Sequence, residues 1–408
     1  MLYDVIIIGS GISGLYAAYK IKKQNPNLSL LVLEKNKKQW IGGRASNETF
    51  YGTEVATAAG IGRKADKLLK TLVSELGFEI NEFKTIPHYS TLVEPVDVLD
   101  ILQYLRGEYK KYRGPPLTFK EFAKPLLGND IYARFLFSAG YTDYEKEDVY
   151  ETLYNYHMED NACCLRGFSV HWRKLILELA KRIGEKNIKF LQKVKSISGN
   201  PGNFSVSVES GAEYICKKVV VATTITSIRT FFPRNPIYKE IEGQPFLRVY
   251  GKFAKQSIPI AKEYIKGYTC VPGPIQKIIP MNPDEGVYMI VYNDNQSTLK
   301  LKDRTENTEE NRDFYCRLLE KSLGIPSGQL HLIGIRSYYW PIGTHYYKPL
   351  RAQSGVSQDD ARDEFIDMAQ HPEDGILVVG EVVSKHQGWV EGALESVAKV
   401  LTKKWIET

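Results

Sequence analysis

The sequence predicts an α/β fold (α+β overall) in which a Rossmann-like nucleotide-binding domain is built from separate segments of the chain. Residues 3–8 form an apolar run that leads directly into a glycine-rich turn, 9–14, and then into a helix-like stretch. Two more strand patterns of the fully buried, parallel-sheet kind occur far along the chain, at 218–223 and 375–381. We therefore expect one parallel sheet interrupted by inserted segments that form a second domain.

The glycine-rich turn has the spacing of a dinucleotide-binding loop. Gly9 can supply the tight turn, Gly11 allows the backbone to approach a pyrophosphate, and Gly14 allows the helix to pack close to the strand. Backbone N–H groups and the dipole at the start of the helix then face the phosphates. The turn therefore predicts a phosphate-binding site at the N-terminus of the first helix.

A second strand pattern, 29–33, ends in Glu34, which lies 20 residues after Gly14. An acidic side chain at that distance accepts hydrogen bonds from an adenosine ribose, and its charge opposes the 2′-phosphate of NADP. The alternative is that the glycines only turn a strand into a helix and that Glu34 only caps a sheet edge. The complete strand–helix–strand unit favours the dinucleotide site over this alternative.

Bulk properties exclude several other classes of function. The net charge is +6 over 408 residues, without a long basic tract interleaved with aromatic residues, so we expect no nucleic-acid binding. None of the five cysteines forms a CxxC pair, which argues against zinc and against a disulfide framework; the adjacent Cys163 and Cys164 are interpreted as core residues. The absence of a signal-peptide pattern and of a 20-residue apolar stretch predicts a cytoplasmic protein without a membrane span.

Two long insertions separate the nucleotide-binding segments. An amphipathic helix is predicted at 65–76, and helical patterns then dominate the first insertion, at 96–112, 119–127, 129–138 and 170–183. The second part predicts a mixed or antiparallel sheet from alternating runs at 246–253, 287–292 and 330–339, with one helix at 310–322 and a polar loop at 293–311. We assign 1–75, 185–235 and 365–408 to the nucleotide-binding domain, and 76–184 and 236–364 to a substrate-binding domain.

Motifs at both ends and in the middle of the chain resemble those of the flavin-containing amine oxidases. The most specific part is the Gly-Glu strand end followed, seven residues after Glu381, by Gly-x-x-Glu-Gly-Ala. The motifs that carry the resemblance are residues 9–14, Glu34, Gly42-Gly43-Arg44, residues 219–222, Gly380-Glu381 and residues 388–393.

The resemblance implies FAD, held in a domain that is assembled from three discontinuous segments. It places the pyrophosphate at the loop, the adenosine ribose at Glu34, the adenine at a backbone group and the flavin pyrimidine at the N–H of the last helix. Members with covalent flavin carry a cysteine near their second active-site aromatic, and none stands there in this chain, so noncovalent FAD is expected. The implied contacts, in chain order, are Gly9, Ser10, Gly11, Gly14, Glu34, Gly43, Arg44, Val194, Gly380, Glu381 and Val390.

The resemblance also implies two aromatic rings that frame a substrate amine in front of the flavin. Trp389 stands at one of these positions, although it could simply pack against the final helix. The second wall is expected from Tyr346, with Tyr347 as the next candidate. Because neighbouring residues of a strand point to opposite faces, only one of the two tyrosines can face the substrate.

Arg248 occupies the position where the family commonly carries a lysine that holds a water near flavin N5, with Lys252 as the alternative if the strand register differs. Arginine positions water differently from lysine, which puts efficient reaction with O2 in question. The expected activity is oxidation of a C–N bond in a small amine, polyamine or amino acid, with O2 or another acceptor reoxidising the flavin. The alternatives are an FAD-dependent isomerase or desaturase without an amine substrate, and an inactive FAD-binding scaffold. The pattern favours no particular amine and no oligomeric state.

Overall fold

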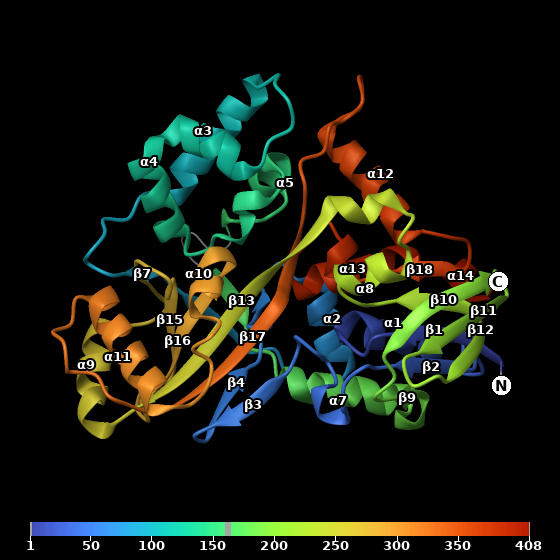
Figure 1. Cartoon of the computed structure of the whole chain (residues 1–408), viewed down its shortest axis with the longest axis horizontal. Coiled ribbons are helices and arrows are strands. Elements are labelled where there is room, and N and C mark those ends of the chain that lie inside the picture. The colour runs from blue at the N-terminus through green and yellow to red at the C-terminus, as the bar shows by residue number, and fades with distance from the viewer. Residues whose placement is uncertain (1, 160–164, 408) are drawn as a thin grey trace.

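The computed structural model describes residues 2–159 and 165–407, which form two sheets beside each other and a separate group of helices (Figure 1). The seven-stranded sheet carries both termini at its outer end. The six-stranded sheet lies at the opposite end, and the helices α3, α4 and α5 stand above the junction. Cys163 and Cys164 lie outside the described residues.

The seven-stranded sheet contains the predicted nucleotide-binding strands. Its order is β10-β11-β12-β1-β2-β9, with β18 beside β12, and β1 is parallel to both β2 and β12. Strands from the start, the middle and the end of the chain therefore meet, as predicted. The bounds are β1 Leu2–Ile8, β2 Leu30–Leu33, β9 Ile188–Lys189, β10 Val194–Asn200, β11 Asn203–Val208, β12 Glu213–Val221 and β18 Ile376–Val378.

Helices cover both faces of this sheet. On one face, Ile7 and Val220 share a core with helices α1 (Ile12–Gln24), α2 (Lys67–Glu75), α7 (Trp172–Ile183) and α13 (Val390–Val400). On the other face, Val219 and Val221 pack with α8 (Ile225–Phe231) and α12 (Gln358–Gln370). Helix α7 therefore belongs to the core of the nucleotide-binding sheet, although the sequence assigns residues 76–184 to the substrate domain.

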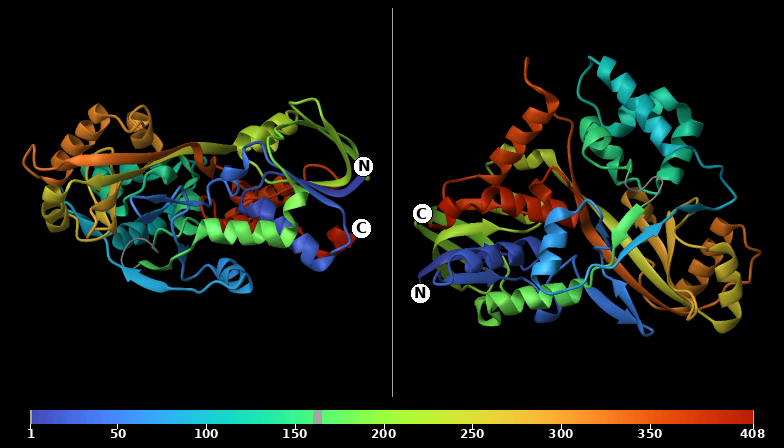
Figure 2. Two further views of the ribbon diagram at one scale, coloured as in Figure 1. Left: turned by 90° about the horizontal axis from the view of Figure 1, so that it is seen from below. Right: turned by 180° about the vertical axis from the view of Figure 1, so that it is seen from behind.

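The six-stranded sheet has the order β17-β13-β16-β15-β14-β7, and its two longest strands run back toward the first sheet (Figures 1 and 2). One face is covered by α9 (Ile258–Tyr264) and α11 (Glu309–Leu323), with Leu247 and Ile290 in the shared core. The strand bounds are β7 His88–Tyr89, β13 Ile241–Phe253, β14 Thr269–Cys270, β15 Lys277–Asn282, β16 Val287–Asp294 and β17 Leu332–Tyr347.

The predicted polar loop at 293–311 is wrong in its first half, where the chain forms helix α10 (Asn295–Leu301). Asn293 and Thr298 are fully buried, and the Thr298 hydroxyl donates to the Asn293 side chain at 2.8 Å. Polar residues that satisfy each other inside the protein resemble a solvated loop in sequence, which explains the error.

The helical insertion contains α3 (Val98–Lys111), α4 (Phe119–Ala139) and α5 (Val149–Tyr154). Thr118 and Glu121 form a capping box at the start of α4, and Gly128 (φ 74°, ψ 170°) interrupts it, between the two predicted helices at 119–127 and 129–138. The remaining elements are β3 Asn47–Phe50, β4 Thr53–Ala56, β5 Gly62–Arg63, β6 Glu82–Thr85, β8 Leu165–Phe168 and α14 Lys403–Glu407. Within 2–159 and 165–407, no helix combines the length and apolarity needed to cross a bilayer.

Candidate cofactor and substrate site

The glycine-rich loop joins the end of β1 to the start of α1. Gly9 has φ 107°, and a Cβ there would lie 2.4 Å from the carbonyl oxygen of Ala222 on the neighbouring segment. A Cβ on Gly14 would lie 2.1 Å from the Gly9 carbonyl oxygen. By contrast, a Cβ on Gly11 would meet nothing within 4 Å. Two glycines therefore allow the backbone to pack closely, whereas the third leaves open space at the helix N-terminus.

A second glycine loop lies against the first. The Gly42 N–H donates to the Ser10 carbonyl oxygen at 2.9 Å, and Gly43 (φ 57°) again has nothing within 4 Å of its Cβ position. Helix α1 has neither a side-chain cap nor an acidic residue in its first turn. Open backbone beside a helix N-terminus without acidic residues is suited to an anionic group such as a pyrophosphate.

Glu34 lies at the carboxyl end of β2 with its side chain buried against this loop. One carboxylate oxygen accepts from the Ser10 N–H at 2.9 Å and the Ser10 hydroxyl at 2.7 Å, and the other from the Asn36 N–H at 2.8 Å. The Glu34 carbonyl oxygen accepts from the Gln192 N–H at 2.8 Å, which brings the segment before β10 to the same place. Val194 begins β10 and pairs with Val208 of β11. The segment that leads into β10 therefore passes the end of β2 at Glu34.

A buried ionic cluster joins the beginning and the end of the chain. One oxygen of Glu381 accepts from Arg44 at 2.7 Å and from the His345 ring nitrogen Nδ1 at 2.5 Å, and the other accepts from the Gly388 N–H at 3.0 Å. The Ile225 N–H donates to Nε2 of the same ring at 3.2 Å, which assigns the ring proton to Nδ1. Burial alone would raise the pKa of Glu381, but His345, Arg44 and Gly388 outweigh it and hold that pKa well below its usual range.

The turns around Glu381 are fixed by the last helix. Gly380 (φ 123°) donates its N–H to the Ser396 hydroxyl at 2.7 Å. Val390 is the first residue of α13, whose N-cap Trp389 makes no side-chain cap hydrogen bond. The first N–H groups of this helix therefore have no partner within the helix and are suited to a partly negative ligand atom.

Trp389 contacts charged residues in the structure. Its ring nitrogen donates to Asp66 at 2.8 Å, and the Arg63 guanidinium carbon lies 3.8 Å from the centre of a Trp389 ring. Arg63 and Asp66 stand at β5 and the start of α2, so Trp389 also connects the last helix to this region. The Arg63 contact could not be predicted from spacing, because it joins residues more than 300 positions apart.

The structure gives the two candidate tyrosines of β17 different surroundings, as strand alternation requires. Tyr347 is buried, donates its hydroxyl to the Ser384 carbonyl oxygen at 2.9 Å and packs against Phe365. Tyr346 is half-buried and lies opposite Glu242 in the sheet. The Tyr347 ring thus belongs to the core of the nucleotide-binding sheet, and the second aromatic contact stays a prediction for which Tyr346 is the more exposed candidate. The residue of this stretch that reaches Glu381 is His345, which sequence reasoning did not single out.

The segment 56–60 connects the ionic cluster to the six-stranded sheet. The Ala59 N–H donates to the Arg44 carbonyl oxygen at 2.9 Å, the Trp340 ring nitrogen to the Thr57 carbonyl oxygen at 3.0 Å, and the Tyr250 hydroxyl to the Ala56 carbonyl oxygen at 2.6 Å. The face of the sheet that carries Trp340 and Tyr250 is therefore turned toward the nucleotide-binding loops.

Arg248 belongs to this same face, two residues before Tyr250 on β13. Its guanidinium carbon lies 3.3 Å from the centre of the Tyr292 ring and 4.5 Å from that of Phe246. The residue is buried, and its Nη1 atom has no hydrogen-bond partner among the described residues. Lys252, the alternative, instead pairs with Glu285 at 3.5 Å. Arg248 is thus a cation on this face with an unused hydrogen-bond donor.

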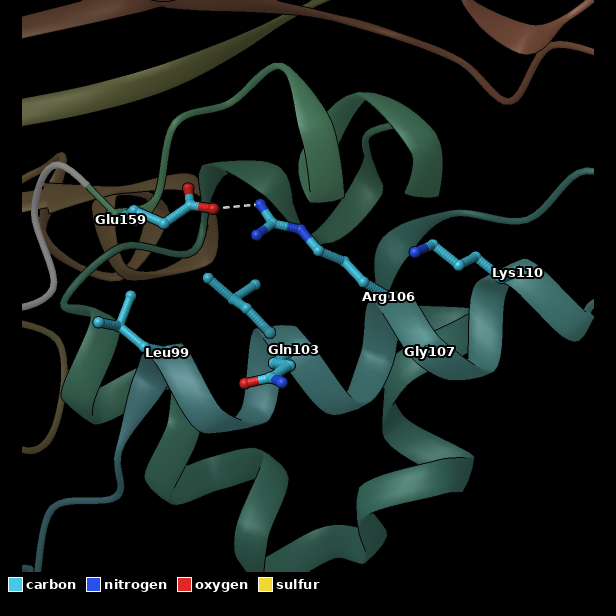
Figure 3. A pocket seen from close by; sticks show the side chains of 7 residues that line it. Leu99, Gln103, Arg106, Gly107, Lys110 and Glu159 are labelled. Atoms are coloured by element: carbon cyan, nitrogen blue, oxygen red, sulfur yellow. Dashed lines mark ion pairs between the residues drawn. The ribbon is translucent and has the colours of Figure 1, made fainter.

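A surface pocket of about 510 Å³ lies along α3, lined by Leu99, Gln103, Arg106, Lys110 and others, with an ion pair between Arg106 and Glu159 (Figure 3). These residues belong to the helical insertion and none belongs to the loops described above. In the parts of the chain that the structure describes, no group of three or more His, Cys, Asp or Glu residues is arranged to hold a metal ion.

Comparisons with known proteins agree with this geometry. Residues 7–76 match the family described as NAD(P)-binding Rossmann-like domain. A double variant of putrescine oxidase has a similar structure, with a TM-score of 0.77 and 14% identity over 100% of both chains. Cyclohexylamine oxidase from Brevibacterium oxydans IH-35A gives 0.73 and 15% over 100% of this chain and 99% of that one.

A protein from Exiguobacterium sp. 255-15, provisionally named protoporphyrinogen oxidase, gives a TM-score of 0.71 and 14% identity over 100% of this chain and 99% of that one. Similarity at this level of identity establishes architecture. The predicted α/β architecture and the resemblance to the amine oxidases are thereby confirmed at the level of the fold. The chain has the fold of the flavin-containing amine oxidases and begins with a Rossmann-like dinucleotide-binding segment.

Proposed function

We propose that the protein binds FAD noncovalently and oxidises a C–N bond of a small amine, polyamine or amino acid, with O2 or another acceptor taking the electrons. The observation that carries the proposal is the convergence of three distant segments on one strip of backbone. Gly11 and Gly43 leave this strip open, Glu34 stands at one end, and the Arg44–Glu381–His345 cluster and the start of α13 stand at the other.

Each part of the strip suits one part of the dinucleotide. The N–H groups at the start of α1 fit the pyrophosphate, with Gly9, Ser10, Gly11 and Gly14 shaping the loop. Glu34 and the backbone of Val194 fit the adenosine. Arg44 has a guanidinium free on one side to approach a phosphate, because Glu381 and the Gly343 carbonyl oxygen hold its Nη1.

The flavin end of the cofactor has its own candidate contacts. Gly43 and Gly380 keep the backbone close, and the N–H of Val390 is available at the start of α13. The oxygens of Glu381 already accept three protein hydrogen bonds. Glu381 therefore serves mainly as a positioning residue that fixes Arg44, His345 and the turn at Gly388.

When bound, FAD supplies the two-electron acceptor, and the substrate carbon loses a hydrogen to give an imine that water converts to a carbonyl compound and an amine or ammonium. The protein's task is to orient the amine and to exclude bulk water. Trp389 and the half-buried Tyr346 are the proposed aromatic contacts, and Arg248 can hold a water or a polar substrate group through its unpartnered Nη1. The named amine oxidases of similar fold support this reaction class.

The experiment is anaerobic reduction of the purified protein. A flavoprotein of this kind is yellow as isolated, and its visible flavin absorbance bleaches when a substrate amine is added without O2. A panel of monoamines, diamines and amino acids, followed by readmission of O2 and measurement of peroxide, identifies the substrate class and the acceptor. Protein that retains no flavin after reconstitution with excess FAD would refute the cofactor assignment.

One observation favours a second candidate, an FAD-dependent isomerase or desaturase that acts without an amine. Trp389 is covered by Arg63 at 3.8 Å, so one of the two rings expected to frame an amine already faces a protein cation. This candidate predicts a yellow protein whose flavin no amine or amino acid bleaches. The inactive scaffold predicts the same and, in addition, no reduction by any small dehydrogenation substrate.

A further inference from the structure

A row of four residues crosses the six-stranded sheet on the face turned toward the nucleotide-binding loops. Arg248 of β13 is directly opposite Tyr338 of β17 on one side and Tyr292 of β16 on the other, and Tyr292 is in turn opposite Lys277 of β15. Residues directly opposite one another in neighbouring strands project to the same face. The sheet therefore carries two basic side chains, Arg248 and Lys277, in one row with a tyrosine between them.

Both side chains are buried and have unused hydrogen-bonding capacity. Lys277 is 0% exposed and Arg248 is 6% exposed, and neither the Lys277 ammonium nor Arg248 Nη1 has a hydrogen-bond partner among the described residues. Burial lowers the pKa of Lys277 well below its usual value, so the amine is held as an ammonium only when an anion lies beside it. An unsatisfied buried donor is costly, so such groups normally have a partner. Two of them on the same face indicate that a ligand supplies the missing acceptor.

The two groups are close enough to share one ligand. The Lys277 nitrogen lies 4.0 Å and the Arg248 guanidinium carbon 3.3 Å from the centre of the Tyr292 ring, so they are separated by no more than about 7.3 Å. A carboxylate accepts charge-assisted hydrogen bonds of about 2.8 Å on each of its oxygens and can span such a gap. The Tyr141 ring, from the helical insertion, lies 2.8 Å from the Lys277 nitrogen and closes the site on the far side.

The nearest acidic groups are already occupied. Asp294 accepts from the Thr142 N–H at 3.1 Å and from the Gln276 amide at 3.2 Å, and Asp143 accepts from the Tyr156 hydroxyl at 2.6 Å. Burial and the neighbouring Asp294 raise the pKa of Asp143 to about 7, and burial also raises the pKa of Asp294. These acids therefore do not provide the two full negative charges that would neutralise Lys277 and Arg248.

We infer that Arg248 and Lys277 form a subsite for a carboxylate, so that the substrate is an amine that also bears a carboxylate group. This inference rests on the proposed function and specifies its substrate class. Arg248 stands on the part of the sheet nearer β17 and the segment 56–60, and the backbone of Lys277 lies two strands farther away, about 10 Å at the usual strand spacing. The carboxylate is accordingly held on the side of the substrate remote from the nucleotide-binding loops.

The test compares amino acids with the amines that differ only by loss of the carboxylate. Purified holoprotein is mixed anaerobically with phenylalanine or phenethylamine, and with lysine or cadaverine, and flavin bleaching is followed. In parallel, binding of benzoate is measured by thermal shift, which requires neither turnover nor flavin. The amino acids should react at lower concentration than the matched amines, and benzoate should raise the Tm.

The variants are Lys277→Met, which keeps the length of the side chain but removes its charge, and Lys277→Arg, which restores a cation. Lys277→Met should weaken benzoate binding about ten- to a hundredfold, the usual effect of losing a charge-assisted hydrogen bond. Amine binding should be unchanged, and Lys277→Arg should recover part of the affinity. The control is Lys262→Met on α9, which pairs with Asp284 on the covered face and should alter nothing.

Two results would overturn the carboxylate subsite while leaving the proposed function intact. The first is that amines bleach the flavin, benzoate leaves the Tm unchanged, and amino acids do not react at lower concentration than the matched amines. The second is a faster reaction with cadaverine than with lysine that the Lys277→Met substitution does not change. This result would indicate that Asp143 and Asp294 bind the distal ammonium of the substrate. A protein that stays colourless but still binds benzoate through Lys277 would refute the flavin proposal and keep the anion site.

Discussion

The nucleotide-binding loops and the substrate-side sheet differ in whether their buried charged groups have hydrogen-bond partners within the protein. Around the loops, both oxygens of Glu34 and of Glu381 accept hydrogen bonds from protein groups. On the sheet, the Lys277 ammonium and Arg248 Nη1 are buried without a protein acceptor, and Asp143 stands close to a second carboxylate, Asp294. The protein itself thus holds the charged side chains of the loops in place, whereas the sheet has buried polar groups whose missing partner a ligand would supply.

The largest effect is expected within the loops, from two alanine substitutions with opposite consequences. In Gly14→Ala the new Cβ would lie 2.1 Å from the Gly9 carbonyl oxygen, so the free energy of unfolding should fall by about 3 kcal/mol. In Gly11→Ala the Cβ enters open space, and at φ −67° it causes no strain, so stability should be unchanged while FAD affinity falls. Chemical denaturation of the apoprotein and FAD titration separate the two effects.

Equal destabilisation by the two substitutions would contradict this assignment, because it would mean that Gly11 is also required by protein packing. A loss of FAD affinity in neither variant would mean that the open strip does not receive the cofactor.

The second prediction concerns the preorganised anion Glu381. Its pKa in the folded protein is below its ordinary value of 4.5, so ionised Glu381 stabilises the fold above that pH, and the contribution is lost as the pH falls further. Glu381→Gln should lower the free energy of unfolding at pH 7 by about 2 kcal/mol, the size of a charged hydrogen-bond loss. The variant's stability should also fall less steeply than the wild type's below pH 4.5.

The matched control for Glu381 is Glu285→Gln, whose carboxylate is exposed on the surface. It should leave both the stability at pH 7 and the acid limb of the profile as they are in the wild type. A Glu381→Gln variant with the wild-type acid limb would show that Glu381 is not the titrating group.

The fold of the nucleotide-binding half could be predicted from the sequence because its motifs are local. Gly9, Gly11, Gly14 and Glu34 act through a turn and the ends of two adjacent strands, and such positions follow from spacing alone. The same reasoning identified Gly380 and Glu381 through a short strand end. The roles of these residues toward a cofactor remain predictions.

The substrate half depends on contacts that spacing does not encode. The row of Arg248, Tyr292 and Lys277 is set by the register of three strands, and irregular pairing between residues 244 and 246 shifts β13 relative to β17. Strand alternation correctly separated Tyr346 from Tyr347 but could not tell which faced the core. His345 was missed because its partner, Glu381, is 36 residues away on a different element.

On the sheet, the pH dependence should have the opposite sign from that of Glu381. Asp143 has its pKa raised from 3.8 to about 7 by burial and by Asp294, so the folded protein holds this proton more tightly than the unfolded chain. Stability should therefore fall as the pH rises from about 4 to 7. In Asp143→Asn this fall should be reduced by about 1 to 2 kcal/mol, since the amide still accepts from Tyr156 and carries no charge.

Denaturation of the wild type and of Asp143→Asn across pH 4 to 8 measures the effect. The surface variant Asp284→Asn, at a carboxylate whose pKa is lowered by Lys262, is the control and should not flatten the profile in this range. Identical profiles for Asp143→Asn and the wild type would mean that Asp143 stays charged at neutral pH.

The smallest effect should come from Tyr347, at the end of β17 where the two halves meet. Its hydroxyl donates to the Ser384 carbonyl oxygen at 2.9 Å inside the core, so Tyr347→Phe should cost about 1 kcal/mol of unfolding free energy and leave substrate-dependent flavin bleaching unchanged. Tyr346→Phe gives the contrast, because Tyr346 is half-buried and keeps a proposed role at the substrate. A change in the apparent substrate affinity of Tyr347→Phe larger than that of Tyr346→Phe would reverse the assignment of the two faces and would return the second aromatic wall to Tyr347.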